Sequence, residues 1–179
     1  MAVQRETTRE RILEAAEDAF GETGYHETLV DDIAGRTPLS KGGFYFHFPS
    51  KEDLFFAVID RLADHLTRRA KEAADACDSP LAGADAALSE VLTRLGRRRG
   101  LAKVLLVQGY SMGLAFEKKR VEIFGQFASV IRGELDRAVE AREIKPTNTE
   151  VVARAWLGAV NEIVVNWVYS GTPTPAEAL

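Results

Sequence analysis

Apolar residues recur every three or four positions along most of the chain, which is the spacing of amphipathic helices. The first expected helix buries a face made of Ile12, Leu13, Ala16 and Phe20. A short second helix buries a face made of Leu29, Val30, Ile33 and Ala34. A third begins after Ser40 and runs to about Phe46. No stretch alternates convincingly between apolar and polar residues, so the pattern predicts an all-α fold.

A long fourth helix is expected over about 50–76, and its apolar stripe is Leu54, Val58, Leu62 and Leu66. Further helices are expected over about 81–97, 100–116, 117–143 and 148–171. We predict a small N-terminal domain over 1–50 with three helices, and a helical domain over 51–179. The fourth helix links the two.

Four helix starts carry the spacing of a capping box, in which side chains satisfy free backbone N–H groups. They are Thr7-x-x-Glu10, Thr28-x-x-Asp31, Ser50-x-x-Asp53 and Thr147-x-x-Glu150. Gly24 supplies a plausible left-handed stop for the first helix.

Residues 28–48 have the organisation of a helix-turn-helix, whose second helix enters the DNA major groove. That helix would begin Ser40-Lys41-Gly42-Gly43, and glycines in its first turn are tolerated where the backbone closely approaches another surface. Capped helix N-termini can present N–H groups to phosphates. We expect DNA contacts from Thr28, Ser40, Lys41, Gly42, Gly43, Tyr45, His47 and Lys51. Phe44 and Phe48 are expected in the core.

Charge restricts this interpretation, because the formal net charge is −4. The first fifty residues carry five basic and nine acidic side chains, so any DNA-binding surface must be a local patch. One cysteine, Cys77, excludes an intrachain disulfide and fits the cytoplasm, and the polar start has no signal-peptide core. No apolar run approaches the ~18 residues of a membrane span, so we expect no membrane partner.

The N-terminal motifs resemble those of the TetR family of bacterial repressors. They are Arg11-Ile12-Leu13-x-Ala15-Ala16, Phe20, Gly24-Tyr25, Thr28-x-Val30-x-x-Ile33-Ala34 and Ser40-Lys41-Gly42-x-Phe44-Tyr45-x-His47-Phe48-x-Ser50-Lys51. The resemblance implies a homodimer with an N-terminal DNA-binding domain and a C-terminal domain that binds a small inducer and dimerises. The chain departs from the family pattern at Pro38, Gly43 and Phe46. Pro38 replaces the usual turn glycine and cannot adopt a left-handed φ, so the turn must be built differently.

Gly109-Tyr110-Ser111-Met112-Gly113 matches the nucleophile-elbow pattern of α/β-hydrolases. That fold needs its histidine after the serine, whereas His26, His47 and His65 all precede Ser111. The sequence also lacks a Walker loop, a dinucleotide loop, an HExxH motif and a spaced His/Cys metal cluster. We therefore expect no enzyme, no cofactor and no metal.

The last two long helices are apolar on more than one face, which predicts a four-helix interface between two copies. The interface candidates are Val121, Phe124, Ala128, Ile131, Leu135, Val152, Ala159 and Ile163. A bundle closed within one chain is the alternative.

The same helices could enclose a largely hydrophobic ligand. The candidates are Tyr110, Met112, Phe116, Phe127, Trp156, Asn161 and Trp167. Asn161 could equally form a buried hydrogen bond across a dimer interface.

The resulting hypothesis is a DNA-binding transcriptional regulator, a repressor that a small hydrophobic ligand releases from a palindromic operator. Two other classes stay open, namely a helical enzyme of unrecognised type and an interaction protein that uses the helix-turn-helix only for packing. The sequence leaves open whether ligand releases DNA or promotes its binding.

Overall fold

The computed structural model describes residues 2–172, 174, 175 and 177, and within them it contains helices and no β-strand. The helices are α1 (Ala2–Thr23), α2 (Val30–Gly35), α3 (Lys41–His47), α4 (Lys51–Asp75), α5 (Pro80–Gly96), α6 (Arg99–Leu106), α7 (Leu114–Glu140) and α8 (Thr149–Ser170). A 3₁₀ turn, η1 (Gln108–Met112), joins α6 to α7. The predicted all-α fold is confirmed.

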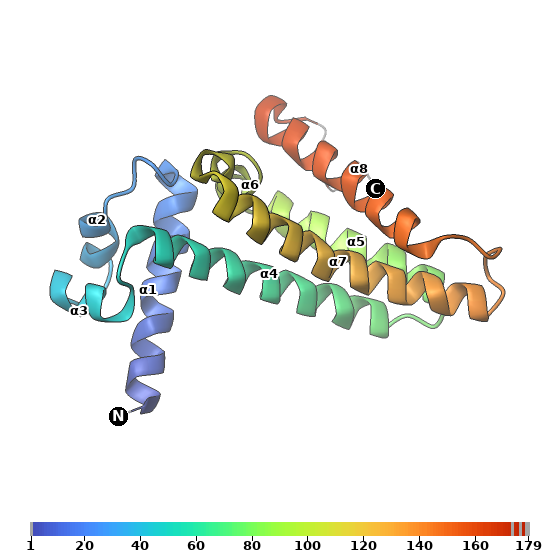
Figure 1. The fold of residues 1–179 in the computed structure, drawn as a ribbon, viewed down its shortest axis with the longest axis horizontal. Coiled ribbons are helices and arrows are strands. Elements are labelled where there is room, and N and C mark those ends of the chain that lie inside the picture. Colours follow the sequence, from blue (N-terminus) through green and yellow to red (C-terminus); the bar gives the residue numbers. More distant parts are fainter. Residues whose placement is uncertain (1, 173, 176, 178–179) are drawn as a thin grey trace.

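The helices form a small head and an elongated body (Figure 1). Helices α1–α3 make the head at one end, and α4 leads from it along the body. Helices α5 and α7 pack against α4, and α8 packs on α7. Helix α6 packs against α1 and α8, so it lies where head and body meet.

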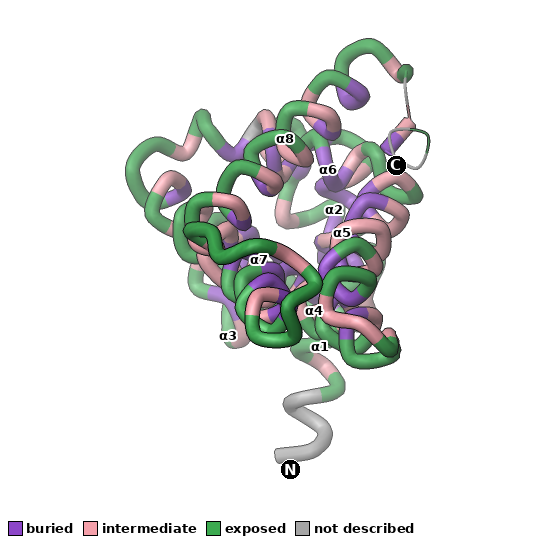
Figure 2. Tube along the Cα trace, turned by 90° about the vertical axis from the view of Figure 1, so that its right-hand side faces the viewer, coloured by how far each residue is buried: buried purple, intermediate pink, exposed green. Residues whose placement is uncertain are grey.

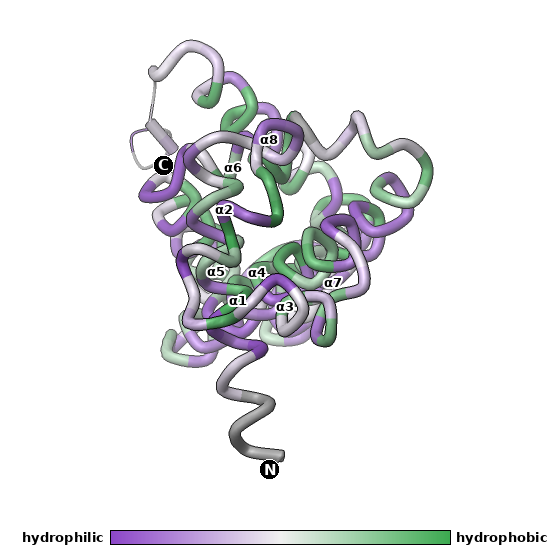
Figure 3. Tube along the Cα trace, turned by 90° about the vertical axis from the view of Figure 1, so that its left-hand side faces the viewer, coloured by the Kyte–Doolittle hydropathy of each residue, from purple (hydrophilic) through white to green (hydrophobic). Residues whose placement is uncertain are grey.

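Helix α4 contributes to two hydrophobic cores. Its first half places Leu54, Phe55 and Val58 in one core with α1, α2 and α3. Its second half places Leu66 and Ala70 in another core with α5, α6 and α8. Buried residues recur along the whole length of α4, from Leu54 to Ala74, so one helix is packed into both the head and the body. Figure 2 shows the buried positions gathered between the packed helices. The head-end view in Figure 3 shows apolar and polar stretches alternating along the helices, as expected of amphipathic packing.

Several sequence-based boundaries were wrong. The expected helix over 100–116 is broken, because α6 ends at Leu106 and Gly113, at φ 70°, precedes α7. The first helix is already helical from Ala2, so the box at Thr7 does not start it. Helix α8 is capped by Asn148, whose side chain accepts from the Val151 N–H, and not by Thr147. The predicted caps at Ser40 and Ser50 and the left-handed Gly24 are confirmed.

Helix α6 crosses α1 at a glycine pair. A Cβ added at Gly100 would overlap the carbonyl group of Gly21, so only glycine permits this crossing. An ion pair between Arg98 and Glu17 lies beside it. These contacts fix the head to the body.

Helix α8 is long and apolar enough to cross a membrane by length and composition, with 28% of its apolar window buried. That evidence is weak, because core helices pass the same test. The sequence analysis overlooked this property. The apolar side chains that α8 leaves exposed include Val151 and Tyr169.

Replacing Gly100 with alanine should force α6 away from α1, because the new Cβ overlaps backbone that cannot rotate aside. Overpacking of this kind costs about 2 kcal/mol, which corresponds to a fall of roughly 5 °C in Tm for a chain of this size. The control is Gly133→Ala on α7, where a Cβ has no neighbour within 4 Å. Equal thermal melting of the two variants, followed by circular dichroism, would refute the tight crossing.

Candidate DNA-binding interface and effector cavity

Helix α3, the recognition helix of the predicted helix-turn-helix, begins at a capped, exposed N-terminus. The Ser40 hydroxyl accepts a hydrogen bond from the Gly43 N–H at 3.3 Å. Ser50 caps α4 in the same way, accepting from the Asp53 N–H at 3.0 Å. These caps fix the start of α3 and the start of α4, while Lys41 and Gly42 stay exposed in the first turn of α3.

The turn before α3 is built without a left-handed residue. Among the described residues, φ is positive only at Arg142 and three glycines outside this turn. The Thr37 N–H and hydroxyl both donate to the Ala34 carbonyl, at 3.0 and 2.9 Å. This arrangement accommodates Pro38, as the sequence required.

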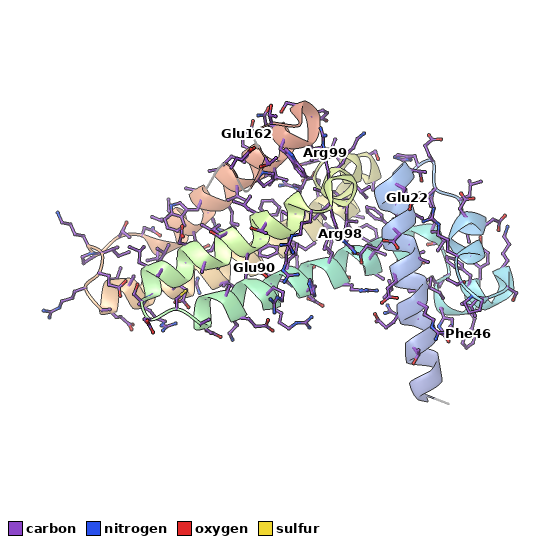
Figure 4. The ribbon with its side chains drawn as sticks, turned by 180° about the vertical axis from the view of Figure 1, so that it is seen from behind. Glu22, Phe46, Glu90, Arg98, Arg99 and Glu162 are labelled. Atoms are coloured by element: carbon purple, nitrogen blue, oxygen red, sulfur yellow. The ribbon has the colours of Figure 1, made fainter. Side chains whose placement is uncertain are left out.

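The aromatic residues of α3 divide between core and surface. Phe44 and Phe48 are buried, which confirms the prediction, and the Arg9 guanidinium lies 5.0 Å from the Phe48 ring centroid. Tyr45 is 43% exposed and Phe46 is 64% exposed. Figure 4 shows Phe46 on the outside of the head. Tyr45 is therefore available to a phosphate, and Phe46 adds an apolar surface that the sequence analysis did not include.

Lys41 is held by an exposed ion pair with Asp31, with a Nζ–oxygen distance of 2.8 Å. The hydrogen bond from Lys41, and then the Asp31 charge, raise the pKa of the lysine, so it stays charged at neutral pH. Exposed pairs contribute little to stability, and a DNA phosphate can replace Asp31. The role of Lys41 in binding DNA remains a prediction, as do those of Ser40, Gly42, Gly43, Tyr45 and half-buried His47.

Thr28 does not occupy its predicted position. Its side chain is 1% exposed, and its hydroxyl lies 2.6 Å from the Gly24 carbonyl and 2.7 Å from the Thr23 hydroxyl. The residue that precedes α2 is Leu29, whose N–H donates to the Asp32 carboxylate. Thr28 therefore holds the loop after α1, and its burial prevents contact with a phosphate.

Lys51 is also occupied within the chain. Its ammonium donates to the carbonyls of Tyr25 and Thr28 at 2.8 and 3.0 Å and lies 3.4 Å from that of His26. Burial of the amine lowers the pKa of Lys51. Since its three donors face three carbonyls, this lysine fastens α4 to the loop after α1 and is not free for DNA in this arrangement.

The apparent nucleophile elbow is not one. Ser111 lies on the 3₁₀ turn η1 between two helices, whereas an elbow requires a strand before it. The Ser111 hydroxyl is 2.6 Å from His26 Nε2, which joins the loop after α1 to the body. This hydrogen bond is another contact between head and body.

The body contains a small apolar cavity of about 60 Å³, bounded by α4, α5, α6, α7 and α8. Three predicted ligand residues line it, namely Phe116, Phe127 and Asn161. The other four predicted ligand residues do not line it. Tyr110 is exposed, and Met112 packs against the core of the head. Trp156 of α8 lies beside the start of α5, and Trp167 is buried in the second core. Helical spacing alone did not reveal which face of each helix turns toward the cavity.

Arg120 is a cavity residue that the sequence analysis missed. Its guanidinium carbon lies 5.4 and 5.5 Å from the ring centroids of Tyr110 and Phe124, and its Nε is buried without a hydrogen-bond partner. The sequence signal for this residue was an arginine one helical turn before Phe124, on an apolar helix face. A buried donor beside an apolar space is suited to a ligand's polar group.

The predicted dimer residues do not form one exposed surface. Ala128, Ile131 and Leu135 are buried within the protomer, which contradicts their assignment to a dimer interface, and Phe124 lines the cavity. Val121 and Ala159 are exposed, and Val152 and Ile163 are half-buried. The three buried residues close the protomer's own contact between α7 and α8.

Comparison with known proteins agrees with this architecture. The family model described as bacterial regulatory proteins, tetR family, matches residues 12–58. The HTH-type transcriptional repressor Rv3405c of Mycobacterium tuberculosis is 32% identical over 144 residues, which cover 79% of this chain and 68% of the relative. The chain belongs to the TetR family. It is therefore a DNA-binding transcriptional regulator of the helix-turn-helix class.

Two further similarities extend over most of the chain. The fatty acid metabolism regulator protein of Bacillus subtilis is 27% identical over 161 residues, covering 88% of this chain and 82% of the relative. The crystal structure of the Bacillus subtilis regulator FadR in complex with stearoyl-CoA superposes with a TM-score of 0.84 at 23% identity, covering 95% and 92% of the two chains. The superposition with FadR extends over both the head and the body of this chain.

Gly42→Ala should separate stability from DNA binding. Inside the protein, a Cβ at Gly42 would only meet the Ser40 hydroxyl at 3.9 Å, and alanine favours a helix by about 1 kcal/mol. We expect unchanged or higher Tm but at least tenfold weaker DNA binding, because the methyl group intrudes between α3 and DNA. Fluorescence anisotropy measures binding, with Gly133→Ala as control. Wild-type affinity in Gly42→Ala would exclude close approach at this residue.

Proposed function

We propose that this regulator is a repressor, released from a palindromic operator by a largely hydrophobic effector that enters the cavity of the body. The observation that carries the proposal is the position of α4. Leu66 of α4 lines the cavity, while Leu54 and Phe55 of the same helix lie in the head core. A ligand in the cavity would therefore contact α4, the helix that leads from the head into the body.

The size of the cavity supports a change of conformation on binding. Its volume of about 60 Å³ is well below the roughly 300–1,000 Å³ of pockets that hold drug-sized ligands. A long apolar ligand therefore has to separate the surrounding helices, including α4. The two heads of a dimer enter successive major grooves when they are about 34–36 Å apart. A ligand that favours another spacing therefore opposes DNA binding by linkage.

An aromatic series provides a direct contact between cavity and head. Phe116 lines the cavity, and its ring centroid lies 6.3 Å from that of Phe55 on α4. Phe55 in turn lies 5.6 Å from Phe20 and 4.7 Å from Tyr25. Displacement of Phe116 by a ligand would press on α4 and α1 together.

We infer that the effector is a long-chain acyl compound, specifically an acyl-CoA. The named function of the Bacillus subtilis relative and the stearoyl-CoA bound to the FadR fold neighbour support this choice. The cavity supports it independently, because its wholly apolar lining suits a hydrocarbon chain.

We also propose that residues 1–50 form the DNA-binding domain and residues 51–179 the effector-binding and dimerisation domain. Val151, Ala155 and Ala159 follow one exposed stripe of α8, with Val121 exposed on α7. At Gly125 and Gly158, a Cβ would have no neighbour within 4 Å, leaving room for another helix to approach. Pairing these faces across a two-fold axis would cover the apolar surface.

Asn161→Leu should reduce the response to effector while preserving operator affinity. Loss of one hydrogen bond costs about 1.4 kcal/mol, equivalent to a tenfold higher stearoyl-CoA concentration for half-release. The assay is anisotropy of labelled DNA from the gene's own upstream region, with competitor DNA and stearoyl-CoA. Trp156→Phe, outside the cavity, serves as control. Failure of stearoyl-CoA to release the wild type would refute the acyl-CoA proposal.

Ala159→Glu should convert the dimer to a monomer, because the change buries an unpaired carboxylate in the proposed α8 interface. Light scattering coupled to size-exclusion chromatography gives the mass directly. Operator affinity should fall at least tenfold, since one head reads only half of the site. Ala82→Glu, an exposed alanine at the α5 start, is the control. A dimeric Ala159→Glu variant would place the interface elsewhere.

A further inference from the structure

A second cleft, of about 820 Å³, opens between α1, α4 and the junction of α5 with α6. Four of its lining residues are acidic and six are arginines, namely Arg9, Arg61, Arg68, Arg94, Arg97 and Arg98. Figure 4 shows Arg98 at the junction between α1 and the body. The lining therefore carries two more positive than negative formal charges, in a chain whose formal net charge is −4.

The carboxylates of the chain only partly neutralise these arginines. Arg94 pairs closely with Glu90, at 2.5 Å, and Arg98 pairs with Glu17. Arg61 faces three α1 carboxylates, but its distances to them are 3.4, 3.6 and 3.9 Å. Within the described part of the chain, Arg68 and Arg97 form no ion pair, and both are exposed. Two guanidinium groups are therefore available to an added anion.

His65 lies between two of these arginines. Its Nδ1 is 3.3 Å from the Arg68 guanidinium, and its Nε2 is 3.3 Å from that of Arg94. A neutral imidazole has one acceptor nitrogen, so it can satisfy only one of the two donors. Burial first, and then the charges of Arg94 and Arg68, lower the pKa of His65. Around His65, the N–H donors of the two arginines therefore outnumber the acceptor nitrogens.

The cleft adjoins the apolar cavity. Leu66 of α4 and Leu95 of α5 line both spaces, so the two spaces meet at this leucine pair. A ligand with a hydrocarbon tail and an anionic head would find an apolar site and an arginine-rich site next to each other.

We propose that the arginine cleft binds a phosphate-bearing anion, the head group of the amphiphile whose tail occupies the cavity. The guanidinium fork matches phosphate oxygens geometrically and stays charged at all physiological pH values. The placement of the tail rests on the proposed function, whereas anion binding to the cleft does not.

Anion binding here has a consequence for the reading head. Phosphate oxygens that engage Arg98 and Arg61 compete with Glu17 and the other α1 carboxylates for these guanidinium groups. The α1 helix thereby loses ion pairs that tie it to α4 and α6. Head-group binding and tail binding then both change the position of the head.

The test is isothermal titration calorimetry with coenzyme A, inorganic pyrophosphate and stearoyl-CoA. We compare wild type with Arg68→Gln/Arg97→Gln, which removes the two unpaired cleft charges. The control, Arg142→Gln/Lys145→Gln, removes two exposed charges between α7 and α8. We expect coenzyme A to bind wild type and the control equally, and to bind the cleft variant at least tenfold more weakly, with all three proteins folded by circular dichroism.

The other outcomes are equally definite. Pyrophosphate that binds as tightly as coenzyme A would support the anion site and identify its ligand as a free phosphate compound. Coenzyme A that binds while stearoyl-CoA fails to release DNA would support the cleft and refute the acyl effector. No binding of coenzyme A or pyrophosphate to wild type, or equal binding to the cleft variant, would overturn the proposal. So would loss of operator affinity in the ligand-free cleft variant without any anion binding, because the cleft would then serve DNA.

Discussion

The burial of α4 in two hydrophobic cores is the constraint on which the rest of the structure depends. One helix of 25 residues packs its first turns against the head and its later turns against the body. A helix transmits displacement along its axis because its backbone hydrogen bonds make it stiff. Under the proposed function, a rearrangement of the body around a ligand would therefore move the helix that leads into the head.

The contacts beside α4 determine how firmly the head is held. The Gly21–Gly100 crossing brings two backbones together, and the hydrogen bond between His26 and Ser111 joins the same regions. Lys51 uses its ammonium to hold the loop after α1 to the start of α4. Tight packing makes the head a rigid unit, whereas the charged pairs around Arg61 and Arg98 are contacts that another anion can exchange.

The apolar cavity and the arginine cleft lie on two sides of Leu66 and Leu95. The apolar cavity and the arginine-rich cleft therefore both border α4, although their chemistry differs. The exposed α8 stripe of Val151, Ala155 and Ala159 is the surface proposed to pair with a second copy. In the proposed arrangement, DNA, effector and partner each use a separate surface of the protomer, and α4 connects the first two.

The sequence by itself determined the helical periodicity, the family, the Ser40 and Ser50 caps and the burial of Phe44 and Phe48, because each depends on local spacing or local hydrogen bonds. It failed where a side chain's neighbour comes from a distant segment. Thr28 and Lys51 matched DNA-contact positions, yet their polar groups are directed inward. Likewise, Ile131 and Leu135 fitted a dimer seam but close the protomer's own core. Periodicity identifies an apolar face, and only tertiary packing decides what covers it.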